Sequence, residues 1–257
     1  MSGELDGKVA VVTGGANGIG RGMVTAFVAE GAHVVIADLD VTAAESVAAE
    51  LGDAVAFQRT DVSDADSVQA AVDFAVARFG SLHVMVNNAG IASAFRRLMQ
   101  DDFRDFSRVM GVDLFGVFIG TQRAARVMGE GGSIINTASI AGVTAGIGLM
   151  TYRAAKAGVI HFTRSAAIEL AERGIRVNVI VPGNISTEIN AAFDNAAIMQ
   201  RMQPLQRLGT TQDVANAAVY LASERSAQVT GIILPVDGGT TAGPPPPRPD
   251  DVMAKPK

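Results

Sequence analysis

A tyrosine and a lysine, Tyr152 and Lys156, stand four residues apart, and Ser139 precedes them. On a helix, side chains with this spacing lie on one face. Oxidation of an alcohol needs a base beside the hydroxyl oxygen as the hydride leaves. A free phenol ionises only near about pH 10, so a neighbouring ammonium would have to stabilise the phenolate. The trio therefore indicates an acid–base centre in which Ser139 orients the substrate oxygen, although an amphipathic surface pair shows the same spacing.

A glycine-rich stretch follows the first predicted strand and reads Thr-Gly-Gly-Ala-Asn-Gly-Ile-Gly over residues 13–20. Glycines let the backbone turn sharply and approach a pyrophosphate, which the N-terminus of the next helix then stabilises. An ordinary tight turn is the alternative, because a glycine-rich turn alone is a weak signal. The residues expected to contact the dinucleotide here are Gly14, Asn17, Gly18, Ile19 and Gly20.

An acidic residue, Asp38, ends the second predicted strand. A carboxylate at this position accepts hydrogen bonds from the adenosine ribose hydroxyls and repels a 2′-phosphate. Asn17 and Leu39, where a basic residue would accept that phosphate, are neutral. A helix cap is the alternative role for Asp38. The cofactor expected is therefore NAD, with further contacts from the ends of the next strands at Asp61, Val62, Asn88, Ala89 and Gly90.

The composition restricts the classes of protein to which the chain can belong. It has 257 residues, 48% of them hydrophobic and 18% charged, which indicates one folded domain. It has no cysteine, so disulfides and thiolate–metal sites are excluded, and we expect no metal site. A net charge of −5 argues against a nucleic-acid partner. No window reaches the ~18 apolar residues of a membrane span, and residues 1–8 do not resemble a signal peptide, so we expect a cytoplasmic protein.

Alternating elements must position these groups. Strands are predicted at residues 9–13, 33–37, 55–59, 82–87, 133–137, 176–181 and 232–236. Helices are predicted at residues 19–30, 43–51, 67–79, 102–128, 151–172 and 213–222. This order is typical of a single α/β domain of Rossmann type, a doubly wound seven-stranded parallel sheet with helices on both faces. The carboxyl ends of its strands would form one crevice, where ligands bind.

Two regions interrupt the alternation. Residues 183–208 are long for a strand–helix connection and are rich in apolar side chains, which predicts a lid over the substrate. The preceding apolar residues Val143, Ile147, Leu149 and Met150 add to an expected hydrophobic pocket. Residues 244–257 contain four consecutive prolines and predict a flexible tail after a catalytic domain of residues 1–243.

Taken together, these motifs resemble the short-chain dehydrogenase/reductase family over about residues 5–239. The resemblance rests on Thr-Gly-x-x-x-Gly-x-Gly at 13–20, Asp61, Asn-Asn-Ala-Gly at 87–90, Ser139, Tyr-x-x-x-Lys at 152–156, Pro-Gly at 182–183 and Asp-Gly-Gly at 237–239. It implies that Tyr152 is the acid/base, that Ser139 holds the substrate oxygen, and that Lys156 binds the nicotinamide ribose and tunes the tyrosine.

The resemblance also implies contacts and partners that the residues alone do not. It places Pro182, Gly183, Ile185 and Thr187 beside the nicotinamide. It implies a homotetramer built on the helices at about 102–128 and 151–172, whose apolar and small side chains exceed what one sheet face can cover.

Asp113 departs from the family's pattern, which usually has asparagine at the corresponding place in residues 111–116. The family's asparagine kinks the helix and holds a proton-relay water, partly through its backbone carbonyl. An aspartate would keep the carbonyl but change the charge and remove the side-chain donor. We therefore count Asp113 with the catalytic residues and leave the form of its role open.

The function expected is hydride transfer between NAD(H) and a secondary alcohol or its ketone, with a hydrophobic substrate. One alternative is a 3-oxoacyl-thioester reductase, which Asp38 disfavours because such enzymes usually take NADP. The other is a catalytically inactive dinucleotide-sensing protein, which would not need Ser139, Tyr152 and Lys156. The sequence does not name the substrate or the direction of the reaction.

Overall fold

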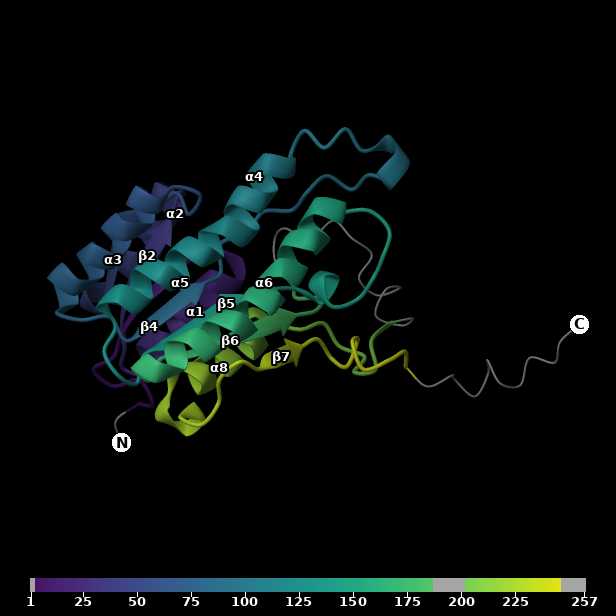
Figure 1. Ribbon diagram of the computed structural model, residues 1–257. Helices are drawn as coiled ribbons and strands as arrows, with labels where there is room; N and C mark the ends of the chain where they lie inside the picture. The colour runs from purple at the N-terminus through teal and green to yellow at the C-terminus, as the bar shows by residue number, and fades with distance from the viewer. Residues whose placement is uncertain (1–2, 187–201, 246–257) are drawn as a thin grey trace, which may run out of the picture.

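The computed structural model describes residues 3–186 and 202–245 and contains one parallel sheet of seven strands (Figure 1). The strands are β1 (Val9–Thr13), β2 (His33–Asp38), β3 (Val55–Arg59), β4 (Val84–Asn87), β5 (Ser133–Thr137), β6 (Arg176–Pro182) and β7 (Ile233–Val236). Their order is β3-β2-β1-β4-β5-β6-β7. The order reverses between β1 and β4, and this is the place where a doubly wound sheet opens a ligand crevice. The predicted fold is confirmed.

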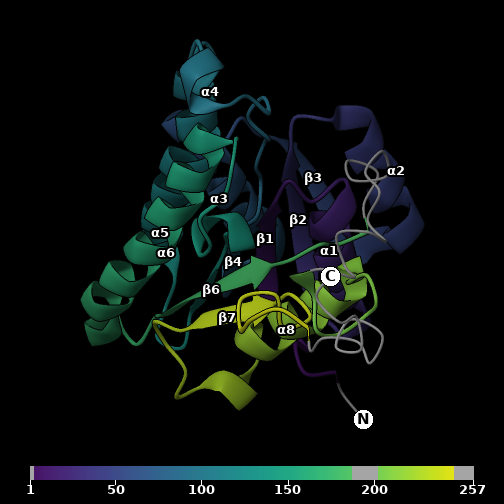
Figure 2. The ribbon, with the colours of Figure 1, turned by 90° about the vertical axis from the view of Figure 1, so that its right-hand side faces the viewer.

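Helices cover both faces of the sheet and make three layers (Figure 2). Helices α1, α2 and α8 pack on one face, and α3, α5 and α6 pack on the other. The α-helices are α1 (Gly18–Ala29), α2 (Val41–Leu51), α3 (Ala65–Phe79), α4 (Phe106–Met110), α5 (Gly116–Val127), α6 (Met150–Leu170) and α8 (Thr211–Ala222). Among the described residues, no helix combines the length and apolarity that a membrane crossing demands.

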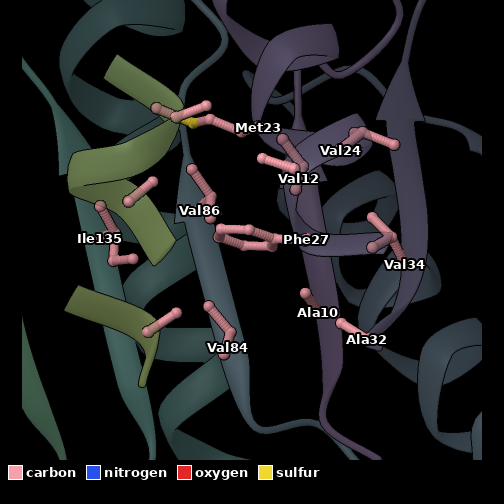
Figure 3. Packing of buried hydrophobic residues seen from close by; sticks show 14 of the residues in the cluster. Ala10, Val12, Met23, Val24, Phe27, Ala32, Val34, Val84, Val86 and Ile135 are labelled. Carbon is pink, nitrogen blue, oxygen red and sulfur yellow. The ribbon is translucent and has the colours of Figure 1, made fainter. Parts of the chain in front are cut away.

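Buried apolar strands explain why the sheet forms at the centre. All five residues of β1 are buried, and Phe27 of α1 is fully buried against this face of the sheet. Figure 3 shows its ring between the side chains of Val12 on β1 and of Val84 and Val86 on β4. Removing such a ring costs about 3–5 kcal/mol, so this cluster anchors the two strands that flank the crevice.

A ladder of buried polar side chains crosses the other half of the sheet. The amide of Asn87 on β4 donates to the side-chain oxygen of Asn136 on β5 at 2.8 Å, and Asn136 donates to the Thr163 hydroxyl of α6 at 2.9 Å. Thr163 in turn donates to the Val159 carbonyl at 2.8 Å. These bonds satisfy groups that would otherwise be costly to bury, and they fix β4, β5 and α6 relative to one another.

The helix predicted at residues 102–128 runs without interruption over residues 106–127, but it is not a regular α-helix throughout. The helix begins later, at Phe106, and α4 is followed by a π-helical turn, η3 (Gly111–Phe115), before α5 starts at Gly116. A π turn accommodates an extra residue and is frequent at functional sites. Here the turn contains Asp113, whose side chain is completely buried. The π turn therefore directs this residue into the protein and not to the helix surface.

Candidate active site

Ser139 lies where β5 gives way to a short 3₁₀ turn, η4 (Ile140–Gly142). Its Oγ accepts the Ala141 backbone N–H at 3.2 Å. The turn rests directly on α6, because a Cβ added to Gly142 would lie 2.6 Å from the carbonyl carbon of Lys156. A side chain at position 142 would therefore push the turn away, and this glycine keeps the Ser139 segment against the helix that carries Tyr152 and Lys156.

Tyr152 and Lys156 lie on the first two turns of α6, as their spacing predicts. Lys156 is 3% exposed, and its Nζ lies 5.6 Å from the centre of the half-buried Tyr152 ring. The ammonium donates to the Thr137 carbonyl at the end of β5, over 3.2 Å. The lysine and the tyrosine thus come together at the end of β5.

Asp113 holds this lysine from the opposite side. Its Oδ1 lies 3.0 Å from Lys156 Nζ, and both side chains are buried, at 0% and 4% exposure. Its Oδ2 accepts the Ile91 backbone N–H at 3.1 Å. Gly90 completes the contact, since a Cβ there would lie 2.7 Å from Asp113 Oδ1 and 3.2 Å from Lys156 Nζ. The structure thus joins Gly90, Asp113 and Lys156, which are far apart in the sequence.

The glycine-rich turn between β1 and α1 forms a cradle, which is the concave backbone of residues 13–20. Gly14 has a φ of +63°, and a Cβ there would lie 2.9 Å from the Ala89 Cα. A Cβ on Gly20 would overlap the Gly14 carbonyl, so α1 can approach the turn this closely only if residue 20 is glycine. Asn17 is the N-cap residue of α1 but makes no side-chain cap bond. The first N–H groups of α1, from Gly18 and Ile19 onward, therefore remain available to an anion.

Asn88 and Thr13 tie this cradle to the end of β4. The Asn88 amide donates to the carbonyls of Thr13 and Gly14 at 3.1 and 3.3 Å. The Thr13 hydroxyl accepts the backbone N–H groups of Asn88 and Ala89 at 2.9 and 3.1 Å. The two loops on either side of the sheet's switch point are therefore held as one unit.

Asp38 occupies the position expected for a ribose-binding carboxylate. Its Oδ2 accepts the Ala16 N–H at 3.0 Å, and its Oδ1 accepts the Asp40 N–H at 3.0 Å. Each carboxylate oxygen can accept a second hydrogen bond, which leaves capacity for the two ribose hydroxyls. The cap of α2 is Asp40, which accepts the Ala43 N–H at 3.0 Å, so the helix-cap alternative for Asp38 is wrong. Beside it, Leu39 is 52% exposed, as a residue that covers an adenine would be.

Asp61 and Val62 follow β3 at the same edge. The Asp61 carboxylate accepts the backbone N–H and the hydroxyl of Ser63, at 2.9 and 2.7 Å, and these bonds hold its pKa below the usual range. This side chain therefore stabilises its own turn. Val62 is buried and packs in a small cluster with Ala89 on its border, which brings the ends of β3 and β4 together.

The end of β6 meets the Asp-Gly-Gly turn. Gly183 lies against Asp237, since an added Cβ would be 2.7 Å from the Asp237 Cα. Asp237 holds its own turn by accepting the N–H groups of Gly239 and Thr241 at 2.9 and 2.7 Å. Ile185 is buried and bridges to Gly209. Pro182 ends the strand, whereas Thr187 and the centre of the predicted lid, residues 187–201, lie outside the described residues.

Two residues near the start of α6, Arg153 and Phe95, belong to none of the sequence motifs. Arg153 donates from Nε to the Gly148 carbonyl and from Nη1 to the Thr144 carbonyl, both at 3.0 Å. Phe95 reaches over from the loop after β4, and a Cβ on Gly148 would lie 2.9 Å from its ring. The exposed apolar side chains of Val143 and Ile147 belong to the loop that Arg153 holds, just before α6. An arginine directly after the tyrosine could have been noted as a loop anchor, whereas Phe95 is placed only by tertiary packing.

This site fits a nicotinamide dinucleotide. The cradle excludes side chains where a pyrophosphate would pass, Asp38 offers acceptors to a ribose, and Lys156 offers a donor deeper in the crevice. These features lie in line along the carboxyl edge of the sheet, from β2 to β5, in the order of the parts of such a molecule.

Comparison with known proteins agrees with this geometry. A family model described as Enoyl-(Acyl carrier protein) reductase matches residues 14–241. The chain is 45% identical to a cis-4-hydroxycyclohexanecarboxylate dehydrogenase of Sinomonas cyclohexanicum, covering 91% of this chain and 97% of that protein. It is 42% identical to a 3-alpha-(or 20-beta)-hydroxysteroid dehydrogenase of Mycobacterium tuberculosis, covering 95% and 93%.

A solved structure gives the same result in three dimensions. The crystal structure of a short-chain type dehydrogenase/reductase from Mycobacterium marinum superposes with a TM-score of 0.86 at 34% identity, over 92% of this chain and 96% of that one. Dehydrogenases of the short-chain dehydrogenase/reductase family typically use a nicotinamide dinucleotide, and the chain belongs to this family and is an oxidoreductase that interconverts secondary alcohols and ketones.

Proposed function

We propose that this protein transfers a hydride between NAD(H) and a hydrophobic secondary alcohol or ketone, with Tyr152 as the acid–base residue. The observation that carries the proposal is the buried Lys156 ammonium, 5.6 Å from the Tyr152 ring and anchored by Thr137 and Asp113. An ammonium is costly to bury alone, and Asp113 offsets that cost while leaving the ammonium close to the Tyr152 ring.

Each residue then has one task during oxidation. A bound nicotinamide supplies the acceptor for the hydride. The Ser139 hydroxyl donates a hydrogen bond to the substrate oxygen, and Tyr152 removes the hydroxyl proton as the carbonyl forms. Lys156 holds a ribose hydroxyl and stabilises the tyrosinate. The alcohol thus loses one hydride and one proton to become a ketone, and the proton leaves Tyr152 for solvent.

The preference for NAD over NADP rests on Asp38 and its surroundings. The Asp38 carboxylate is fixed by two backbone N–H groups, from Ala16 and Asp40, and so cannot turn away from a 2′-phosphate. Asn17 and Leu39 are exposed but carry no charge that would compensate that phosphate. The repulsion between the carboxylate and a 2′-phosphate would therefore disfavour NADP.

The hydrophobic substrate is supported by the side chains around the entrance. Phe95, Val143 and Ile147 are 71%, 48% and 62% exposed, and they sit on the two loops nearest the catalytic helix. Such surfaces in a protein of this kind usually cover an apolar ligand. Two relatives are named for a hydroxycyclohexane acid and a hydroxysteroid, so we propose an alicyclic secondary alcohol.

The same enzyme is proposed to work as a homotetramer through α5 and α6. Phe118 and Phe162 stack at 3.8 Å between ring centres, and the turn before α5 carries the exposed side chain of Phe115 and α6 that of Ile168. A large exposed apolar patch on a folded protein marks an interface, and a second copy of the same face fits it by symmetry. We further propose that residues 1–243 form the catalytic domain and that the tail takes no part in it.

The test is a panel of alicyclic, steroidal and linear secondary alcohols, followed by NADH absorbance. We expect turnover of ring alcohols with NAD. In Tyr152→Phe, kcat should fall by about 10²–10⁴-fold while NAD affinity stays. Lys156→Ala should lose activity and bind NAD more weakly, whereas Ser139→Ala should lose activity alone. A Tyr152→Phe variant that keeps more than about a tenth of wild-type kcat, with chemistry rate-limiting, would refute the mechanism.

A further inference from the structure

Asp113 is a buried carboxylate whose two visible neighbours are both hydrogen-bond donors. Oδ2 accepts the Ile91 N–H at 3.1 Å, and Oδ1 faces the Lys156 ammonium at 3.0 Å. Only an ionised carboxylate presents two acceptors at once. An asparagine would have to point its NH₂ group either at the Ile91 N–H or at the ammonium. An aspartate accepts from the Ile91 N–H and pairs with the ammonium without this conflict.

We propose that Asp113 is a positioning residue that fixes Lys156 directly and, by offsetting its charge, sets the pH at which Tyr152 can act as a base. The inference rests on the proposed function, because it assigns Tyr152 the acid–base role. It adds a negative charge that offsets the lysine, so Tyr152 becomes a phenolate only at a higher pH than it would beside the lysine alone.

The geometry of the ammonium supports the positioning role. A lysine has three N–H donors. One reaches the Thr137 carbonyl at 3.2 Å, and the ammonium forms an ion pair with Asp113 Oδ1 at 3.0 Å. A further donor remains for a ribose hydroxyl. Two anchors on different elements, β5 and η3, leave the ammonium little freedom, so its remaining donor keeps one direction.

The charge balance supports the second part. An ammonium alone beside Tyr152 would strongly favour the phenolate, and the Asp113 carboxylate cancels much of that field. The other charged side chains on neighbouring segments are poorly placed to replace it. Arg108 on α4 is exposed, and the Arg153 guanidinium is directed to the carbonyls of Gly148 and Thr144. Neither η4 nor β5 carries a charged residue.

The remaining charged side chains on β6, α5 and α6 lie away from Lys156 along these elements. Arg176 opens β6 at the end opposite Pro182 and donates to Leu221 and Ser226. Arg123 and Arg126 on α5, and His161, Arg164 and Glu169 on α6, come at least one helical turn beyond the residues of the site. Asp113 is thus the acidic side chain that contacts the lysine among the described residues.

The chain offers a direct measurement of this effect. It contains two tyrosines and no tryptophan, so in a Tyr220→Phe background the tyrosinate absorbance reports Tyr152 alone. We would titrate this protein and its Asp113→Asn variant without cofactor or substrate. The expected result is a tyrosinate midpoint lower by about one pH unit in the variant, because one negative charge near the phenol is removed.

A matched control separates charge from loop structure. Asp105 also accepts a backbone N–H of the loop after β4, from Ala94 at 2.8 Å, but its carboxylate is not paired with Lys156. Asp105→Asn should leave the midpoint where it is. If Asp113→Asn does not fold, as judged by circular dichroism, Asp113→Ser takes its place, because it removes the charge with a smaller side chain.

The outcomes separate this inference from the proposed function. A midpoint that moves in Asp113→Asn but not in Asp105→Asn supports the proposal, and the acid limb of kcat/KM for oxidation should then move to lower pH as well. An unchanged midpoint, or equal shifts in both variants, overturns it. Failure of the proposed function would show instead as absence of NADH formation by the wild type, which the titration does not require.

Discussion

The loop in front of the catalytic helix should depend on Arg153. This side chain donates to the Gly148 and Thr144 carbonyls, and its guanidinium lies against Gly146, where no Cβ would fit. The loop ends in two left-handed residues, Gly148 at a φ of +69° and Leu149 at +55°. A non-glycine residue in that conformation costs about 1–2 kcal/mol, so contacts elsewhere must hold it.

Arg153→Met removes both charged donors and keeps the aliphatic stem. Hydrogen bonds to charged groups contribute about 1.5–3 kcal/mol each, and the low end applies because Arg153 is only partly buried. Recovered hydration offsets some of the loss, so we expect a fall of about 2 kcal/mol in the free energy of unfolding. For a chain of this size that is roughly 4–8 °C in Tm.

Urea unfolding followed by circular dichroism measures this change. The control is Arg104→Met, since Arg104 is exposed and its pair with Asp102 should contribute less than about 1 kcal/mol. The KM for alcohol should rise more than kcat falls, because the loop with Val143 and Ile147 lines the entrance. A loss under about 0.5 kcal/mol, or one equal to that of Arg104→Met, would show that Arg153 does not anchor the loop.

Three further results are expected. Calorimetry should show at least a tenfold preference for NAD over NADP, about 1.4 kcal/mol, and Asp38→Asn should reduce it; equal affinities in the wild type would contradict the role of Asp38. Light scattering should give a tetramer, and Phe118→Glu a smaller species, whereas a wild-type monomer at micromolar concentration would refute the interface. Arg207 and the Thr210 N–H hold the pKa of the Asp213 carboxyl well below its usual range, so its stabilisation is present above the unfolded pKa and is lost as pH falls through the folded one. Asp213→Asn should therefore cost about 1 kcal/mol at neutral pH, and the difference from wild type in unfolding experiments should shrink below about pH 4; a constant difference would argue against the ion pair.

The sheet could be predicted because its strands are local signals. Residues 9–13 and 133–137 are short apolar runs next to turn residues, and both strands have the predicted bounds. Because parallel strands bring their ends to one edge, the proximity of the glycine turn and the loop at 87–90 also followed from the order of elements.

The parts that escaped prediction depend on contacts between distant residues. The family resemblance implied a kink at Asp113, but the apolar spacing around it does not indicate a π turn, since the turn accompanies a bond to Ile91 and an ion pair with Lys156. Phe95 likewise belongs to no sequence motif, and only the folded structure places its ring against Gly148. Helical periodicity predicts one regular helix across a π turn, because a single inserted residue hardly changes the apolar pattern.

The ladder from Asn87 through Asn136 to Thr163 limits how sequences of this kind can diverge. An apolar replacement of Asn87 or Thr163 leaves a buried polar atom of Asn136 unpaired, at about 1–3 kcal/mol. Replacing all three with apolar groups of similar shape can be nearly neutral. Descendants of this chain should therefore either keep the whole ladder or lose it together, because a lineage that changes one position first passes through a less stable protein.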